Sequence, residues 1–298
     1  MILDGMSTRP RTALAAALLL VLAGCGTGGT GTAEPGPTQT VAAPVTAERT
    51  HPPAPAPAAP TPAWTPPPLD LASLPVADPW AVLPRAVPDP DPGAVPSGQL
   101  VAPSTPAGAP LYDAPRGEAF ALLPVAAYQG DTAYPVVAQE GDWYQVMLVV
   151  RRGLPSEVGP SGVNEATGWV WAGDVTTSTT DLRITATLST GEVTLWRGEE
   201  VLARTGAGIG TPETPTPVTR TFVMSIYPDP NATYSRLFVT FGAHSPTLDQ
   251  FSGGPAPIAI HAYPSHSGAI SNGCLRIPAD MLDAFAGVPL GTPVLITA

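Results

Sequence analysis

The sequence predicts a mostly β protein in which two folded segments follow a long unfolded N-terminal region. Of its 298 residues, 40 are proline and 30 are glycine, which disfavours long helices. Short runs that alternate apolar and polar residues recur from about residue 98 onward, as expected for half-buried strands. The net charge of −11 and the pI of about 4.6 exclude the basic face that a nucleic-acid-binding protein needs.

Residues 1–25 have the pattern of an export signal. Arg9 and Arg11 precede an apolar run over residues 13–23, which is shorter than the roughly 20 residues that span a bilayer. The run ends in Leu-Ala-Gly-Cys at Cys25, which resembles a bacterial lipoprotein signal with an acylated cysteine. The alternative is an ordinary cleaved signal with an incidental cysteine. We expect lipidation of Cys25 and an extracytoplasmic protein anchored to the outer face of the cell membrane, at the cell wall.

Residues 26–97 have the composition of a disordered, proline-rich linker. They contain 19 of the 40 prolines, and such a chain favours extended polyproline II conformation. A semi-stiff tether of this kind would lift a folded head away from a membrane. Trp64 and Trp80 are isolated aromatic residues in this region, either docking points or ordinary surface residues.

Residues 98–180 predict a small β domain. Strands are expected at 110–115, 134–138, 141–148 and 168–175. The order Gly-Asp-Trp-Tyr at 141–144, then Gly-Trp-Val-Trp at 168–171, resembles bacterial SH3-like barrels, which often accompany cell-wall enzymes. Such a barrel either contacts wall peptide, for example through the loop that Arg151 and Arg152 begin, or only orients its neighbour.

Residues 181–298 predict a second β domain with one short helix. A hairpin is expected from strands at 182–186 and 192–196, and a helix at 278–285, where Pro278 would occupy an early helical position. Further strands are expected at 201–205, 221–225, 237–241, 258–261 and 293–297.

The same segment contains the residues that could carry out chemistry. Cys274 has no partner for a disulfide once Cys25 is acylated, and a leftover thiol in an exported protein is a candidate reactive group. His261 ends an apolar strand 13 residues earlier, so one loop could bring base and nucleophile together. A zinc site of His261, His266 and Cys274 is the alternative, but no second cysteine or HExxH-type pair supports it, so we expect no metal and no cofactor.

These motifs closely resemble a known family. Ile-Ala-Ile-His at 258–261 and Ser-Asn-Gly-Cys-Leu-Arg at 271–276 are similar to the signature of L,D-transpeptidases with the YkuD fold. The segments at 204–218 and 290–296 also fit, so the resemblance covers residues 181–298. It implies a YkuD-type β-sandwich that follows the SH3-like barrel in the chain. Two departures are Asn272, where the family often has histidine, and Ala262, where it usually has glycine or serine.

The resemblance also implies a role for each residue of the signature. Cys274 would be the nucleophile, and His261 would take its proton or hold it in a thiolate–imidazolium pair. A backbone carbonyl near Ala262 would orient the other ring nitrogen. The backbone N–H groups of Gly273 and Cys274 would form the oxyanion hole.

Three further residues are candidates for substrate binding. Arg276 either pairs with a substrate carboxylate or forms a structural pair with Asp280 or Asp283. His266 lies on a loop, where it either contacts substrate or has no role. Ser271 either touches substrate or, as a turn residue, braces the backbone around the thiol.

The implied function is that of a peptidoglycan L,D-transpeptidase. Such an enzyme acts on stem peptides of the wall through a cysteine thioester and forms 3→3 cross-links, and carbapenem β-lactams acylate its thiol. One alternative is a carboxypeptidase or endopeptidase that uses water as the acceptor. Another is a non-catalytic lipoprotein that only binds the wall, although such a protein would have no need for both His261 and Cys274.

Overall fold

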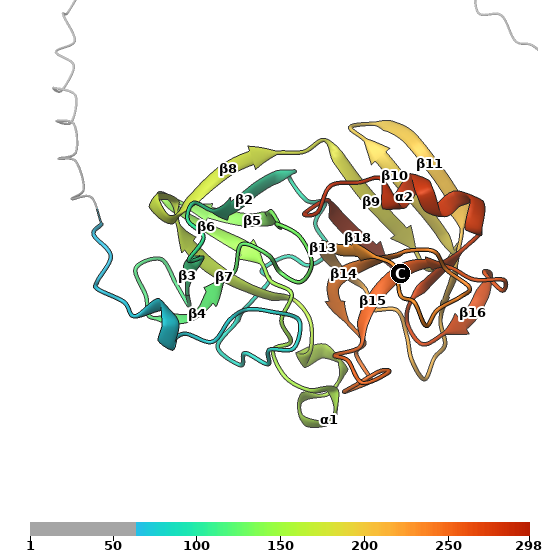
Figure 1. The fold of residues 1–298 in the computed structure, drawn as a ribbon, viewed down its shortest axis with the longest axis horizontal. Coiled ribbons are helices and arrows are strands. Elements are labelled where there is room, and N and C mark those ends of the chain that lie inside the picture. The colour runs from blue at the N-terminus through green and yellow to red at the C-terminus, as the bar shows by residue number, and fades with distance from the viewer. Residues whose placement is uncertain (1–63) are drawn as a thin grey trace, which may run out of the picture. The chain divides into compact units, whose positions relative to one another are not determined.

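The computed structural model describes residues 64–298, and its elements are mostly strands (Figure 1). The mostly β fold class with a short helix is therefore confirmed. Predictions for the first 63 residues, including the export signal and lipidation of Cys25, lie outside the described residues. None of the helices within residues 64–298 is long and apolar enough to cross a membrane.

The first sheet is built from the N-terminal half of the described chain. Its hydrogen-bonded order is β4 (Ala119–Leu123), β3 (Ala109–Tyr112), β7 (Ala166–Trp171), β6 (Trp143–Met147), β5 (Tyr134–Glu140), β2 (Gln99–Pro103) and β8 (Val175–Thr179), with β1 (Val87–Pro88) paired to β7. The strand path ends at β4 and β8 without joining them. Its likeness to an SH3-like barrel stays a prediction.

The second sheet contains the residues of the sequence signature. Its order is β11 (Glu200–Gly206), β10 (Glu192–Arg197), β9 (Leu182–Thr187), β18 (Pro293–Thr297), β13 (Thr219–Tyr227), β14 (Phe238–His244), β15 (Pro257–Ala262), β17 (Leu275–Ile277), β12 (Gly208–Gly210) and β16 (Gly268–Ser271). The helices are short: α1 (Pro155–Val158) in the first half, α2 (Leu282–Ala286) in the second, and four single 3₁₀ turns, η1 (Leu71–Ser73), η2 (Pro160–Gly162), η3 (Ala172–Asp174) and η4 (Ala279–Met281).

Strands with clear alternation lie where the sequence predicts them. The last strand has the predicted bounds, and the other predicted strands of the second segment overlap observed ones. The short strands β12, β16 and β17 were not predicted, because three or four residues show no periodicity. The predicted helix is split, since η4 precedes α2 and Pro278 lies at the cap of the 3₁₀ turn.

The predicted linker is too long at its C-terminal end. From Trp64 onward the chain packs on the first sheet, and Ala77, Leu83 and Ala86 are buried in its core. Strand β1 adds two residues that pair with β7. Proline-rich composition misled the prediction, because proline at an edge or bridge position is compatible with packing as long as its missing N–H is not needed.

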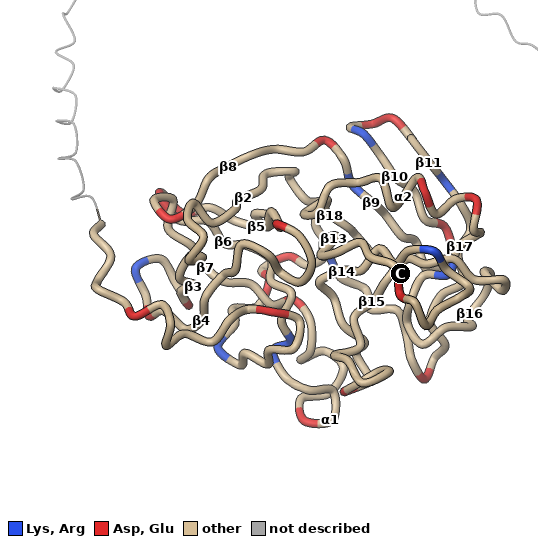
Figure 2. The backbone as a smooth tube through the Cα atoms, in the orientation of Figure 1, with Lys and Arg blue, Asp and Glu red and all other residues tan. Residues whose placement is uncertain are grey.

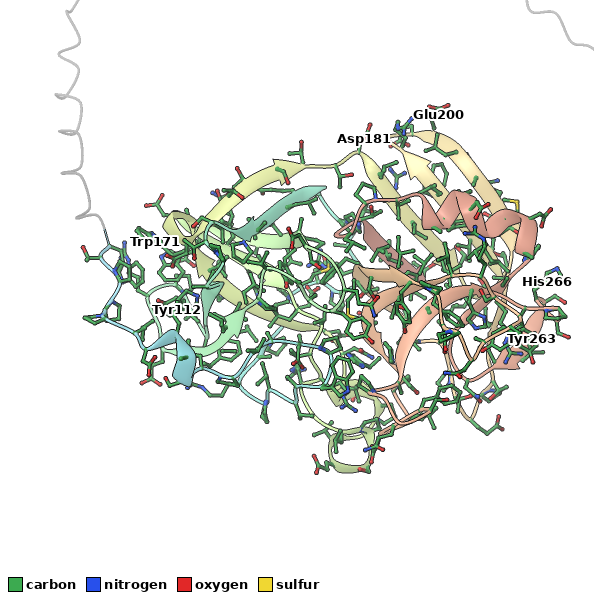
Figure 3. The ribbon with its side chains drawn as sticks, in the orientation of Figure 1. Tyr112, Trp171, Asp181, Glu200, Tyr263 and His266 are labelled. Atoms are coloured by element: carbon green, nitrogen blue, oxygen red, sulfur yellow. The ribbon has the colours of Figure 1, made fainter. Side chains whose placement is uncertain are left out.

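Trp64 is anchored by three aromatic side chains of the first sheet. Its ring centroid lies 5.8 Å from that of Tyr112, 4.8 Å from that of Trp143 and 5.3 Å from that of Trp171, all edge-on. Figure 3 labels Tyr112 and Trp171 on this sheet. Edge-to-face contacts of this kind add to the free energy of apolar burial. Of the two isolated tryptophans, this one is therefore a docking point.

Strand β13 belongs to both hydrophobic cores. Phe222 and Met224 point into the core of the first sheet, whereas Val223 between them points into the core of the second. Alternate side chains of a strand face opposite sides, so β13 is buried on both faces and joins the two halves. The described residues, 64–298, accordingly belong to one compact unit.

Two buried polar contacts also join the halves. Arg220 on β13 forms a bidentate ion pair with Asp89. Its Nε donates to Oδ2 at 2.6 Å, and its Nη2 donates to Oδ1 at 2.5 Å. His244 is fully buried, with Nε2 at 2.8 Å from the carbonyl oxygen of Val149 and Nδ1 at 2.9 Å from that of Pro255. Burial lowers the pKa of His244.

Candidate active site

Strands β15 and β17 bring the predicted nucleophile and base together. They are parallel neighbours with Ile260 opposite Leu275 and His261 opposite Arg276. Cys274 immediately precedes β17. Extending the register by one residue places Cys274 opposite Ala259, which lies two residues before His261 on β15. Residues two apart share one face of a sheet. His261 and Cys274 accordingly line the same cavity of about 90 Å³.

The imidazole of His261 is held in one tautomer. Its Nδ1 lies 2.9 Å from the carbonyl oxygen of Ala262. A carbonyl only accepts, so Nδ1 carries the proton and Nε2 keeps its lone pair. The expected backbone carbonyl at Ala262 is therefore present. The Ala262 N–H donates to Ser235 Oγ at 2.9 Å, which ties this end of β15 to the neighbouring loop.

Ser271 braces the turn that carries the thiol. It is buried, its Oγ donates to the Cys274 carbonyl at 2.6 Å and accepts the Gly273 N–H at 3.1 Å. Gly273 has φ of 108°, and a Cβ there would lie 2.9 Å from a methyl carbon of Ile258. The turn therefore requires glycine. Ser271 also lines the cavity.

The threonines of the segment before β13 support the same turn. Thr216 Oγ1 donates to the Gly273 carbonyl at 2.8 Å, and Thr214 Oγ1 donates to the Ser271 carbonyl at 3.1 Å. This segment is the Thr-Pro-Thr-Pro run that resembles the family. In this chain its threonines satisfy two backbone carbonyls of the turn that carries Cys274.

The oxyanion prediction needs a correction at Gly273. Its N–H is already donated to Ser271 Oγ, so it is not free to stabilise a developing negative charge. The Cys274 N–H has no hydrogen-bond partner within residues 64–298. Of the two predicted donors, the one on Cys274 is available.

Arg276 forms no ion pair with an acidic residue of the described chain, 64–298. Its Nη1 donates to the Ile270 carbonyl at 2.9 Å, and its guanidinium carbon lies over the ring of Tyr263, 4.0 Å from the ring centroid. The predicted alternative pairing with Asp280 or Asp283 is wrong, because Asp283 pairs with Arg236 and no ion pair in the described chain joins Arg276 to Asp280. Because Arg276 lines the cavity, its charge can meet an anionic ligand there.

His266 is not placed on this cavity. It is half-buried, and its Nδ1 lies 3.1 Å from the Pro264 carbonyl oxygen. Figure 3 shows it with Tyr263 beside β16, at the edge of the second sheet. His266 is not among the residues that line the cavity, so the cavity does not support its predicted contact with substrate.

Burial disfavours the charged form of both Cys274 and His261. It raises the pKa of the half-buried Cys274 thiol, although the Ala259 N–H and the Arg276 charge lower it in part. Burial lowers the pKa of His261; the hydrogen bond to Ala262 opposes this shift, and Arg276 adds to it. Both shifts favour the neutral form of each group, so of the two forms expected for the pair they disfavour thiolate–imidazolium.

A second, larger cavity also reaches Cys274 and was not predicted; it adjoins the first, since Tyr234, Phe238, Phe251 and Pro257 line both. Its volume is about 260 Å³. Its walls include aromatic residues from both halves of the molecule: Trp80, Tyr128, Tyr227, Tyr234, Phe238 and Phe251. Trp80 stood out in the sequence as an isolated aromatic residue, but no local signal connected it to Cys274, which lies far along the chain.

A metal centre is not formed by these side chains. Across the described part of the chain, no three His, Cys, Asp or Glu residues are grouped as metal ligands would be. The predicted zinc alternative therefore lacks its ligand set.

Comparison with known proteins assigns the second half of the chain. Residues 181–296 match the YkuD family, described as the L,D-transpeptidase catalytic domain. This segment is a YkuD domain. No curated protein matches the sequence.

Solved structures that resemble the chain carry the same description as the YkuD domain. An L,D-transpeptidase from Mycobacterium smegmatis has 15% identity over 52% of this chain and 91% of its own, with a TM-score of 0.33. One from Mycobacterium tuberculosis H37Rv has 15% identity over 52% and 90%, with a TM-score of 0.36. The catalytic domain from E. faecium has 23% identity over 40% and 98%, with a TM-score of 0.29. Scores this low support no residue roles.

Proposed function

We propose that the protein is a peptidoglycan L,D-transpeptidase that works through a thioester on Cys274. The observation that carries the proposal is that β15, which carries His261, and β17, which Cys274 immediately precedes, are parallel neighbours, and that both residues line one cavity of a YkuD domain. A nucleophile and a base that share a cavity suit two-step acyl transfer.

In the first step the enzyme acylates itself. The Cys274 proton passes to His261 Nε2, and the sulfur attacks the carbonyl carbon of the diamino acid in a tetrapeptide donor stem. The new carbon–sulfur bond replaces the amide bond to the terminal D-alanine. His261 returns the proton to the departing amine, as a group that serves as base and then as acid.

In the second step an amine resolves the thioester. The side-chain amine of the diamino acid in a neighbouring stem attacks the thioester carbonyl, so that a carbon–nitrogen bond forms and the carbon–sulfur bond breaks. The amine proton passes to His261 and then to the sulfur. The product is a 3→3 cross-link between two diamino acids.

Two further groups stabilise charge in these steps. The free N–H of Cys274 donates to the oxygen of the tetrahedral intermediate. Arg276, which lacks an acidic partner, pairs with a carboxylate of the donor stem. Ser271 acts as a positioning residue, since both functions of its hydroxyl are used by the backbone of the turn.

The test is the analysis of muropeptides formed by the full-length protein from a tetrapeptide donor. A dimer linked between two diamino acids supports the proposal, whereas tripeptide alone indicates hydrolysis. Cys274→Ala should form neither product. The matched control is Ser189→Ala, an exposed serine outside the cavity, which should behave as the unaltered protein.

The same material tests covalent chemistry without a wall substrate. We expect a carbapenem to add its mass to the peptide that contains Cys274 and to leave Cys274→Ala unmodified. A wild-type protein that stays unmodified, and that also leaves the donor intact, would instead be a non-catalytic wall-binding lipoprotein.

We also propose that Cys25 carries a lipid and that residues 1–63 anchor the enzyme at the outer face of the cell membrane. The basis is the apolar run that ends in Leu-Ala-Gly-Cys. An alkyne-tagged fatty acid supplied to expressing cells should label the protein, and Cys25→Ala should abolish the label and release the protein from membranes. Labelling that persists in Cys25→Ala would contradict the proposal.

A further inference from the structure

Two cavities meet at Cys274, and their charges are opposite. The smaller one, of about 90 Å³, includes Arg276 as its only permanently charged wall residue. The larger one, of about 260 Å³, includes Asp229 as its only charged wall residue. Cys274 lines both. The two cavities adjoin along shared walls, and a thioester on this sulfur therefore borders one space that holds a cationic side chain and one that holds an anionic side chain.

The carboxylate of Asp229 is available to a ligand. It is half-buried, one oxygen accepts the Asn231 N–H at 2.9 Å, and it forms no ion pair within residues 64–298. Asp229 lines this cavity together with Tyr227 and Tyr234. A cationic group entering this cavity would meet the carboxylate among aromatic surfaces.

The outer wall of the larger cavity does not come from the YkuD domain. Trp80 and Tyr128 belong to the first half of the chain, outside residues 181–296. The ring centroids of Trp80 and Tyr128 lie 5.2 Å apart, and those of Tyr128 and Tyr227 lie 5.6 Å apart. These aromatic contacts continue to Phe238, whose ring centroid lies 6.3 Å from that of Tyr227 and 5.0 Å from that of the His261 imidazole. An aromatic wall thus runs from Trp80 to the catalytic base.

This wall is exposed but held in place. Trp80 is 52% exposed and Tyr128 is 37% exposed. The Asp78 carboxylate accepts the backbone N–H groups of Trp80 and Ala81 at 2.9 and 3.0 Å. Val82, which follows, forms an isolated backbone β-bridge with Arg151. Trp80 on this turn is in contact with Tyr128, which is in contact with Tyr227, and a contiguous exposed apolar patch of this kind marks a site for a ligand or partner.

We propose that the larger cavity is the acceptor site, and that Trp80, Tyr128 and Asp229 select the amine-bearing stem. This inference rests on the proposed function. Asp229 attracts the ammonium of the incoming diamino acid, and the aromatic wall packs against its methylene chain and favours its positive charge. The ammonium gives one proton to water before attack, and the second passes to His261 as the amide forms and the carbon–sulfur bond breaks. The donor, which brings carboxylates, occupies the side of Arg276.

The test separates acylation from transfer in the full-length protein. With a tetrapeptide donor, D-alanine release reports acylation, and the ratio of dimer to tripeptide reports how amine and water compete for the thioester. We expect Asp229→Asn, Trp80→Ala and Tyr128→Ala to keep carbapenem acylation and D-alanine release close to normal. The dimer-to-tripeptide ratio should fall about tenfold in Asp229→Asn, the scale of losing one charge-assisted contact.

Conservative variants and matched controls make the result specific. Trp80→Phe and Asp229→Glu should recover most of the transfer, which a general loss of folding would not allow. Asp142→Asn and Val201→Ala, an exposed acid and an exposed apolar residue away from both cavities, should leave the ratio unchanged.

Two outcomes would overturn the acceptor site. One is an unaltered ratio in all three variants while acylation is intact. The other is a loss of acylation that matches the loss of transfer, because the larger cavity would then hold the donor. If the unaltered protein is not acylated at all, the proposed function fails first and this inference fails with it.

Discussion

At the scale of single residues, the site is defined by what burial does to two ionisable groups. Cys274 and His261 both lose hydration, so the pKa of the acid rises and that of the base falls. The two shifts act in the same direction, toward a neutral pair. Proton transfer then has to accompany attack on the substrate. This is a different arrangement from a preformed thiolate, and it has a measurable consequence.

The reactivity of Cys274 toward a small neutral alkylating reagent should rise with pH. Because the raised pKa leaves little thiolate at neutral pH, the rate should increase about tenfold per pH unit from about pH 6 to about pH 9. Mass spectrometry of the Cys274 peptide would measure this rate separately from Cys25. A rate that is already constant near neutral pH would show a thiolate–imidazolium pair instead.

At the scale of elements, the parallel register of β15 and β17 positions the site, and the turn before β17 completes it. The turn has no regular structure of its own, so side chains satisfy its backbone groups. Ser271 serves two of them, the Cys274 carbonyl and the Gly273 N–H. The Thr-Pro-Thr-Pro segment serves two others. Such contacts explain why a motif far from Cys274 in sequence belongs to the same site.

Removing the Ser271 hydroxyl should destabilise the fold and reduce activity. Ser271→Ala leaves two backbone groups without partners in a buried turn, at a cost of about 1–3 kcal/mol. Chemical denaturation would measure this loss, with the exposed Ser189→Ala as control at less than about 0.5 kcal/mol. Equal stability of the two variants would contradict the bracing role.

The segment before the first sheet is an element of the fold and not a tether. A chain that begins at residue 98 would expose the surfaces covered by Ala77, Leu83 and Ala86 and would lose Asp89. We expect it to unfold at a lower urea concentration than a chain that begins at residue 64. Identical midpoints would show that residues 64–97 contribute nothing to stability.

At the scale of the whole molecule, the two sheets share β13 and cannot be treated as independent modules. The pair of Arg220 with Asp89 is almost completely buried at this junction, with side-chain exposures of 5% and 2%. The arrangement also brings Trp80 and Tyr128 to the cavity of the YkuD domain. Figure 2 shows the basic positions scattered along the described backbone.

Breaking the buried pair should be far more costly than breaking an exposed one. Asp89→Asn leaves the Arg220 charge without a partner in a dry junction, which costs about 3–5 kcal/mol. Glu118→Gln, which removes an exposed partner of Arg85, should leave the melting temperature close to that of the unaltered protein, because solvent screens an exposed pair. Thermal unfolding of the two variants would test the contrast, and similar melting temperatures would contradict it.

The sequence by itself determined the mostly β class, the strands with clear alternation and the identities of Cys274 and His261 as candidates. Those features are local, since periodicity and a signature can be read within a few residues. Only the tertiary structure decided that the Gly273 N–H is occupied, that Arg276 lacks an acidic partner, and that Trp80 lies on a wall of a cavity that reaches Cys274. Each of these depends on which distant backbone and side-chain groups meet, and hydrogen bonding and burial across the chain leave no trace in local spacing.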